Sequence, residues 1–153
     1  MADAAAVRPI NAAIVGAPVP PMELRPLADF GARPLARPSC VLYYFFEPDC
    51  PACAAGAPAW TGIEEIKGAN GSVPVVWILM DREVRAATAF LDTYGIVAPA
   101  LFSAHSSPHH ELGVMGVPTV WGIVNDTLRY TATGVTATSP DEIPVTWCHA
   151  ASG

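Results

Sequence analysis

The segment VLYYFFEPDCPAC, residues 41–53, decides the fold, because an apolar run, a short turn and a cysteine pair follow one another in it. Val41–Phe46 consists of apolar, β-favouring residues, which predicts a central strand covered on both faces. Two residues separate Cys50 from Cys53, so both sulfurs can meet in the first turn of a following helix and close a small disulfide ring. At a helix N-terminus, the positive end of the dipole and free N–H groups favour the Cys50 thiolate. The sequence therefore predicts a redox pair in which Cys50 attacks and Cys53 resolves.

A zinc half-site is the alternative interpretation of the same two cysteines. It needs a second ligand pair, which would have to come from Cys40, Cys148 or the four histidines of the chain. None of these residues forms a second CxxC or a regular HxxxH spacing. The spacing therefore favours the redox interpretation, for which we expect no metal and no cofactor.

The length of the chain predicts one domain. Its 153 residues can bury roughly two thirds of the surface that the unfolded chain exposes. We divide the chain into an N-terminal arm (1–40), a core (41–134) and a C-terminal tail (135–153). Prolines are scattered through the arm, and because proline removes ladder donors and cannot continue a helix, we expect extended chain and short edge strands there.

The charge of the chain excludes several kinds of partner. Charged residues make up 14% of the sequence and the formal net charge is −6, so there is no basic surface for nucleic acid or for a membrane. No apolar run approaches the ~18 residues of a membrane span. The first thirty residues also lack the basic and apolar regions of a signal peptide. We expect protein or small-thiol partners, in the cytosol or, after removal of a signal or anchor, outside it.

The pattern beyond the cysteine pair alternates strands and helices and then gives a hairpin. Pro58 is expected to kink the first helix. The apolar positions Ala86, Phe90 and Leu91 mark one face of the second helix, and Gly95 is its expected C-cap. The expected elements are a helix over Pro51–Ile66, a strand over Val73–Met80, a helix over Arg82–Tyr94, a short strand near Ala100–Phe102, a polar loop over Ser103–His110 followed by a helical turn before Gly116, a hairpin of Thr119–Val124 and Leu128–Thr133 joined by Asn125-Asp126, and one short turn within Asp141–Cys148.

Two motifs in this order resemble the signatures of the thioredoxin superfamily. They are FFEPDCPAC (45–53) and GVMGVPT (113–119), and the resemblance extends over roughly Gly16–Gly134. It implies an α/β thioredoxin-like fold, with a central mixed sheet flanked by helices, an extended proline-rich N-terminal arm and a shortened C-terminus. Three further features are similar to the membrane-tethered, extracytoplasmic branch that includes TlpA and ResA: Gly16-Ala17-Pro18, Cys53 followed by Pro58, and Met80-Asp81-Arg82 before a helix.

The resemblance also implies roles for individual residues in thiol-disulfide exchange with protein substrates. Cys50 matches the nucleophile of the family and Cys53 its resolving cysteine. Pro118 matches the proline held in cis beside the disulfide, and Val117 the residue whose backbone pairs with a bound peptide, with Thr119 completing the substrate-binding segment. An extended substrate would then dock by strand addition next to the sulfurs.

The chain departs from the pattern of the family at three positions near the cysteines. Asp49 stands where thioredoxins usually carry tryptophan, and a carboxylate there disfavours the neighbouring thiolate. Many relatives place a buried acid six residues before the nucleophile or a glutamate three residues after the resolving cysteine, where this chain has Tyr44 and Gly56. The proton relay must therefore come from elsewhere, and the candidates are Glu47 and water. Glu47 is equally open to interpretation as a solvated loop charge.

Cys40 and Cys148 are candidates for a structural disulfide that fastens the tail. Two independent buried thiols are the alternative. The even number of cysteines and the proline-rich arm favour an oxidising compartment, in which such a bridge persists. We therefore expect a periplasmic or other extracytoplasmic location, with the cytoplasm as the alternative.

Two other functions compete with disulfide exchange. Copper delivery is suggested by His105, His109 and His110, but copper-delivery proteins of the SCO type resemble CxxxC, whereas this chain has CxxC. A non-catalytic docking module is suggested by the missing acidic residues and the short C-terminus, which could expose an apolar sheet face. The Pro-Ala dipeptide between the cysteines contains no histidine to stabilise a thiolate, so a reductant is favoured over a strong oxidant.

Overall fold

Strand β2 (Cys40–Phe46) lies in the middle of a mixed sheet, with parallel β4 on one side and antiparallel β6 on the other. The computed structural model describes residues 15–19, 24–27, 39–68, 71–103, 113–114 and 116–149. The strand order is β1-β5-β4-β2-β6-β7, and β3 pairs with the start of β4. The other elements are β1 (Leu24–Pro26), α2 (Pro51–Gly56), the 3₁₀ helix η1 (Ala57–Trp60), β3 (Glu65–Gly68), β4 (Gly71–Leu79), α3 (Val84–Thr93), β5 (Ala100–Ser103), β6 (Thr119–Val124), β7 (Thr127–Thr133), the 3₁₀ helix η2 (Pro140–Glu142) and α5 (Thr146–His149).

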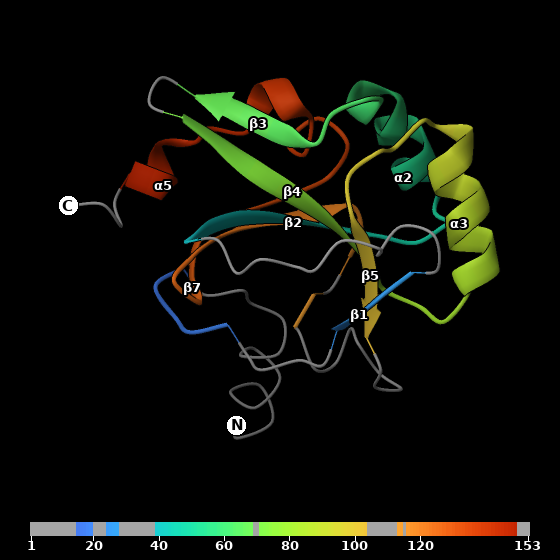
Figure 1. Cartoon of the computed structure of the whole chain (residues 1–153), viewed down its shortest axis with the longest axis horizontal. Coiled ribbons are helices and arrows are strands. Elements are labelled where there is room, and N and C mark those ends of the chain that lie inside the picture. Colours follow the sequence, from blue (N-terminus) through green and yellow to red (C-terminus); the bar gives the residue numbers. More distant parts are fainter. Residues whose placement is uncertain are drawn as a thin grey trace, which may run out of the picture.

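The alternation of side chains along β2 divides the core into two layers. Leu42, Tyr44 and Phe46 face the layer that contains residues of α2, η1, α3 and α5, whereas Val41 and Phe45 face the layer on the other side of the sheet. Both α2 and α3 lie at one end of the sheet, and α5 lies at the opposite end (Figure 1). Burial of β2 on both faces and its central place agree with the prediction from its apolar run, and the mixed sheet flanked by helices is the expected fold class.

The predicted helix over Pro51–Ile66 is wrong beyond Trp60. The α-helix ends at Gly56 and is followed directly by the 3₁₀ helix η1, which contains Pro58. After η1 the chain turns, and Gly62 in this turn has a φ of +73°. Proline lacks the N–H that an α-helical hydrogen bond needs at this point. From Glu65 the chain forms β3, in which Ile66 is buried between exposed neighbours, the period-two pattern of a strand.

The remaining expected elements agree with the structure to within two residues at most boundaries, including β4, α3, β5 and the β6–β7 hairpin. Asn125 and Asp126 both have positive φ, as a two-residue hairpin turn requires. On α3 the buried residues are Ala87, Phe90 and Leu91, so the expectation that Ala86 faces the core is wrong by one position. Of the predicted polar loop only Ser103 is described. Of the helical turn predicted before Gly116, Gly113 and Val114 are described, and Gly113 has a φ of +70°, which is not helical. Among the described residues, no helix is long and apolar enough to cross a membrane.

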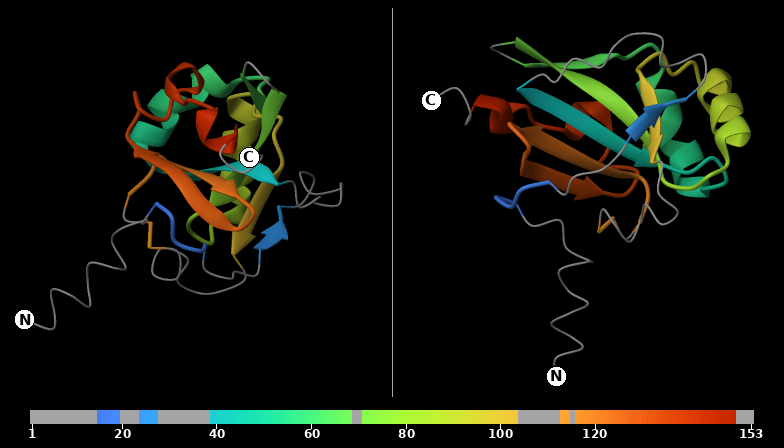
Figure 2. Two further views of the ribbon diagram at one scale, coloured as in Figure 1. Left: turned by 90° about the vertical axis from the view of Figure 1, so that its left-hand side faces the viewer. Right: turned by 60° about the horizontal axis from the view of Figure 1, so that its bottom comes forward.

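The C-terminal tail covers part of the sheet. Cys148 forms a disulfide with Cys40 at the start of β2, with an S–S distance of 2.06 Å. Ile143 and Trp147 are buried in the same core layer as α2, and α5 contacts β6 and β7. The right-hand view in Figure 2 shows α5 at the end of the sheet far from α3. Of the two possibilities for the short C-terminus, an exposed sheet face or a tail held over the sheet by this bridge, the structure has the second.

The packing of Trp147 on β6 predicts a destabilising substitution at Gly122. A Cβ atom added to Gly122 would lie 2.7 Å from the Trp147 ring, too close for a real contact. We expect Gly122→Ala to lower the free energy of unfolding by about 1–3 kcal/mol, because the ring must move or the strand must shift. Urea denaturation measures this loss. Gly116→Ala is the matched control, because a Cβ atom there meets nothing within 4 Å, and an equal loss in both variants would contradict the prediction.

Candidate active site

The register of three strands brings three loops to one edge of the sheet. Phe46 at the end of β2 pairs with Leu79 at the end of parallel β4, so the carboxyl ends of both strands lie together. Strand β6 runs antiparallel to β2 and begins there, with Thr119 opposite Phe45. The turn before α2, the loop before α3 and the loop before β6 therefore meet at this edge. In open α/β sheets this is the edge where functional sites form.

Cys50 is the accessible member of the cysteine pair. It is the N-cap of α2, with extended backbone dihedrals (φ −92°, ψ 115°), and Pro51 begins the helix. The backbone N–H of Cys53 donates a hydrogen bond to Cys50 Sγ at 3.1 Å. The Cys50 thiol, which is half-buried, donates to the carbonyl oxygen of Val117 at 3.6 Å. The predicted position of Cys50 at a helix N-terminus is thus present, together with an N–H group directed at its sulfur.

Cys53 is the buried member of the pair and its side chain has no exposed surface. Burial raises the pKa of the Cys53 thiol far above its ordinary value, and the hydrogen bond with Cys50 and the charge of Glu47 raise it further, while the backbone of Glu47 opposes the rise. At neutral pH the Cys53 thiol therefore keeps its proton. The two thiols thus have different environments, one at the surface for attack and one beneath it.

The loop before β6 lies against Cys50 and is held from within the protein. The Val117–Pro118 peptide bond is cis, and the N–H of Gly134 donates to the Pro118 carbonyl at 3.0 Å. The Thr119 hydroxyl donates to the Gly116 carbonyl at 2.6 Å and also forms a 2.9 Å hydrogen bond with the hydroxyl of Thr133. Because the Thr119 side chain is buried and makes both of these hydrogen bonds, it supports the loop from within.

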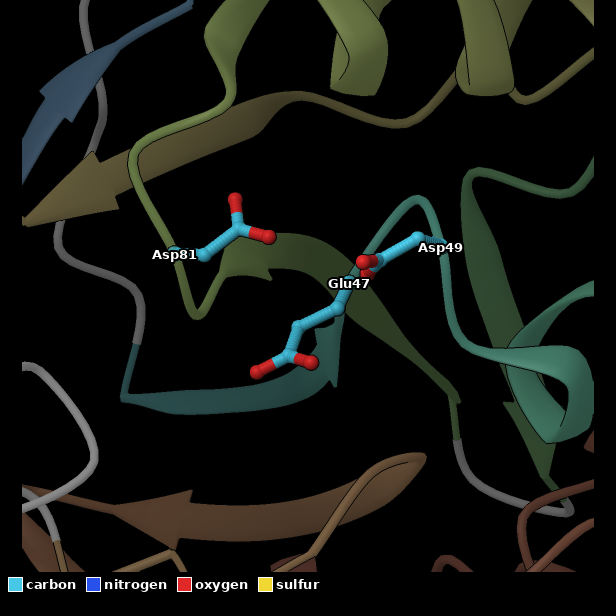
Figure 3. Close-up of side chains that lie close together, drawn as sticks. All are labelled: Glu47, Asp49 and Asp81. Atoms are coloured by element: carbon cyan, nitrogen blue, oxygen red, sulfur yellow. The ribbon is translucent and has the colours of Figure 1, made fainter.

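Three carboxylates gather beside the cysteine turn. The side chains of Glu47 and Asp49, which follow β2, and of Asp81, which follows β4, have carboxylate oxygens within 4.8 Å of one another. Figure 3 shows Asp49 and Asp81 pointing toward one another from two loops, with Glu47 beside them. Asp81 also accepts a 2.9 Å hydrogen bond from the N–H of Glu83, just before α3. The cluster gives the surface near Cys50 a concentration of negative charge that the motifs alone did not predict.

Tyr44 and Gly56, the two departures beneath the cysteine pair, lie next to each other. A Cβ atom placed on Gly56 would be 3.4 Å from the Tyr44 hydroxyl oxygen. The hydroxyl from β2 therefore lies in contact distance of the position on α2 that lacks a side chain. The sequence identified both positions but could not show that they are adjacent in space.

The other predicted residues lie elsewhere. The disulfide of Cys40 and Cys148 is at the start of β2, and this strand runs for about 20 Å before the turn that holds Cys50, so the disulfide is separate from the redox pair. His105, His109 and His110 lie outside the described residues. Glu47 is next to Cys53, which keeps it as a candidate for proton transfer.

Neither a protein-family model nor a curated protein sequence matches the chain. Solved structures do match it. A secreted disulfide oxidoreductase of Mycobacterium tuberculosis, described as homologous to E. coli DsbE, is 25% identical, with a TM-score of 0.55 over 73% of this chain and 81% of its own. A putative thiol:disulfide interchange protein DsbE from Chlorobium tepidum is 19% identical, with a TM-score of 0.64 over 93% of this chain and 100% of its own. StoA from Bacillus subtilis is 12% identical, with a TM-score of 0.62 over 80% and 94%.

These likenesses show which fold the sheet, its helices and the loops at its functional edge form. It is the thioredoxin-like fold that thiol-disulfide interchange proteins share. The fold of the chain is therefore thioredoxin-like, as its two motifs predicted.

Proposed function

We propose that the protein is a thiol-disulfide oxidoreductase that acts on protein substrates through Cys50 and Cys53. The observation that carries the proposal is the unequal pair: a half-buried thiol at the N-cap of α2 accepts the N–H of a buried cysteine one helical turn later. Such a pair supplies an attacking sulfur at the surface and a second sulfur in reach of it. Resemblance to interchange proteins in fold supports the same chemistry.

The mechanism uses two successive exchanges. The Cys50 thiolate attacks one sulfur of a substrate disulfide, the substrate S–S bond breaks, and the leaving thiolate takes a proton from solvent. Cys53 then loses its proton and attacks the Cys50 sulfur, which closes the Cys50–Cys53 disulfide and releases the second substrate sulfur as a thiol. The substrate gains two electrons, and a thiol electron donor must later reduce the pair.

The Val117 carbonyl is placed to hold the substrate. It accepts the Cys50 S–H at 3.6 Å in the thiol state, and formation of the thiolate removes that donor. The oxygen is then available to a backbone N–H of an extended substrate, in the manner of strand addition. Val117 and Pro118 are therefore proposed as the substrate-binding segment.

The direction proposed is reduction of the substrate. Glu47, Asp49 and Asp81 place negative charge near the pair, which disfavours an added thiolate and so favours the disulfide form. A pair that prefers its disulfide gives up electrons readily, whereas a strong oxidant stabilises its reduced form. An oxidising compartment outside the cytoplasm is proposed as well, because the disulfide of Cys40 and Cys148 persists there.

The equilibrium reduction potential of the pair tests this function. We expect a value of about −250 mV or lower in titrations against glutathione and dithiothreitol. Alkylation followed by mass mapping assigns the signal to Cys50 and Cys53 and excludes Cys40 and Cys148. A value of about −120 mV would instead indicate an oxidant of folding proteins. A pair that never closes would overturn the redox function and favour a docking module or a metal-binding protein.

A further inference from the structure

Tyr44 lies in the floor of the proposed site with its hydroxyl group unused. The side chain is fully buried, and its oxygen has no hydrogen-bond partner in the part of the chain that the structure describes. The ring stacks on Trp77 with centroids 4.0 Å apart and meets Trp60 edge to face at 5.3 Å. These contacts fix the ring, so the position of the hydroxyl is fixed as well. A buried donor without an acceptor is costly, and each one in a native protein needs an explanation.

The hydroxyl is directed at the underside of the helix that carries Cys53. It lies 3.4 Å from the position that a Cβ atom on Gly56 would occupy. Gly56 follows Cys53 by three residues, and residues at this spacing share one face of a helix. Both are buried, and Cys53 belongs to the same core layer as Tyr44. The unused hydroxyl and the resolving sulfur therefore face the same small region beneath α2.

Thr138 carries the other hydroxyl group close to Tyr44, but the two hydroxyl groups do not form a hydrogen bond of good geometry. Its hydroxyl donates to the Gly134 carbonyl at 2.6 Å. It lies near enough to Tyr44 to lower the pKa of the phenol, but burial and the nearby Cys53 thiol raise that pKa by more. The net effect keeps the phenol protonated through and beyond the neutral range. Tyr44 is therefore a permanent donor.

We propose that the Tyr44 hydroxyl is held to donate a hydrogen bond to the Cys53 sulfur when that sulfur becomes a thiolate, which makes Tyr44 a positioning residue for the resolving step. This inference rests on the proposed function. In that step the Cys53 thiol gives its proton to solvent, its sulfur attacks Cys50, and the bound thiol leaves with the bonding electron pair. The phenol keeps its own proton throughout and only stabilises the charged sulfur.

The need for such a donor follows from the surroundings of Cys53. Burial, the Cys50 sulfur and the Glu47 carboxylate all raise the pKa of the Cys53 thiol, so its reactive thiolate is scarce. The backbone of Glu47 favours that thiolate, and Tyr44 would add a second donor from below. A hydrogen bond to a charged group is stronger than one between neutral groups. We therefore expect its loss to slow resolution by about tenfold, which corresponds to one pKa unit.

Reduced protein mixed with dithiodipyridine, a neutral aromatic disulfide, separates the two steps. Attack by Cys50 releases the first thiopyridone, and resolution by Cys53 releases the second, so stopped-flow absorbance shows two phases. We expect Tyr44→Phe to leave the first phase unchanged and to slow the second about tenfold. The rate of the second phase should rise with pH, because Cys53 must lose its proton, and in Tyr44→Phe this rise should move to higher pH.

Tyr43→Phe is the matched control, because Tyr43 lies on the other face of β2 and packs against the opposite core layer. Equal slowing of both phases, equal slowing in Tyr43→Phe, or an unchanged second phase with an unmoved pH profile would each overturn the role of Tyr44. Absence of the first phase from the unmodified protein would overturn the proposed function itself, and the inference with it. The Phe ring keeps the contacts with Trp60 and Trp77, so we expect the variant to fold, which circular dichroism checks.

Discussion

Cys50→Ser is expected to reduce the catalysed reduction of a protein disulfide such as that of insulin by more than about a thousandfold, to the background rate of the thiol donor. The reason is that the half-buried Cys50 sulfur is the proposed nucleophile, whereas Cys53 is buried and its pKa is raised by that burial. Serine keeps the size of the side chain and its position at the N-cap, so a loss of rate reports on the sulfur. Turbidity of reduced insulin with dithiothreitol as donor measures the rate.

Cys53→Ser separates the two roles within the pair. This variant still attacks but cannot resolve, so we expect it to accumulate a mixed disulfide between Cys50 and the substrate, visible by mass spectrometry under non-reducing conditions. The same trapped species identifies physiological substrates from a periplasmic or secreted fraction. A Cys50→Ser variant that keeps the full rate, or a Cys53→Ser variant that traps nothing, would support the docking module over the enzyme. The Cys50→Ser, Cys53→Ser double variant serves as the control, because it keeps the disulfide of Cys40 and Cys148 and has no attacking sulfur.

The parts of the fold that the sequence predicts well depend on short-range patterns. The apolar run of β2, the helical spacing on α3 and the Asn125-Asp126 turn each carry their signal within a few neighbouring residues. The two motifs also set the order of the cysteine pair and the Val117-Pro118 loop along the chain. Where these loops meet follows from parallel pairing of β2 with β4 and antiparallel pairing of β2 with β6.

The features that the sequence did not predict depend on long-range register or on competition between local states. Residues 61–66 carry no strong pattern, so the predicted helix runs through Ile66, which instead lies in a short strand fixed by its pairing with Val73 of β4. The carboxylate cluster arises because Asp81 follows a strand that ends beside β2, and the sequence separation hides this. A rule that the carboxyl ends of neighbouring parallel strands meet at one edge would have found it.

The contact between Tyr44 and Gly56 is another feature that depends on long-range register. Sequence shows each position only as a separate loss of an acidic residue, and only the path of α2 above β2 places the Tyr44 hydroxyl 3.4 Å from where a Gly56 side chain would begin. A side chain lost from the helix and one gained on the strand thus form a single arrangement. This is why the sequence predicted the absence of a carboxylate relay and not the presence of a buried donor.

Removal of the disulfide between Cys40 and Cys148 is expected to have the largest effect on stability. The bridge joins residues 108 positions apart, and closing a loop of that length stabilises a fold by roughly 4 kcal/mol in the chain-entropy model. It also fastens the tail whose Trp147 packs over Gly122. We therefore expect the Cys40→Ala, Cys148→Ala double variant to unfold at a much lower urea concentration than the unmodified protein with its disulfide intact. An unchanged midpoint would contradict this account.

The activity of the same double variant distinguishes a structural bridge from a redox one. Cys40 begins β2, whereas Cys50 follows the other end of this strand, which is about 20 Å long, so the two pairs are too far apart to exchange electrons directly. At temperatures well below its unfolding transition, the double variant should therefore reduce insulin at close to the original rate, and its Cys50–Cys53 potential should be unchanged. A shifted potential in the folded double variant would show that the tail bridge is linked to the redox pair, because removing a purely structural bridge leaves the environment of Cys50 as it was.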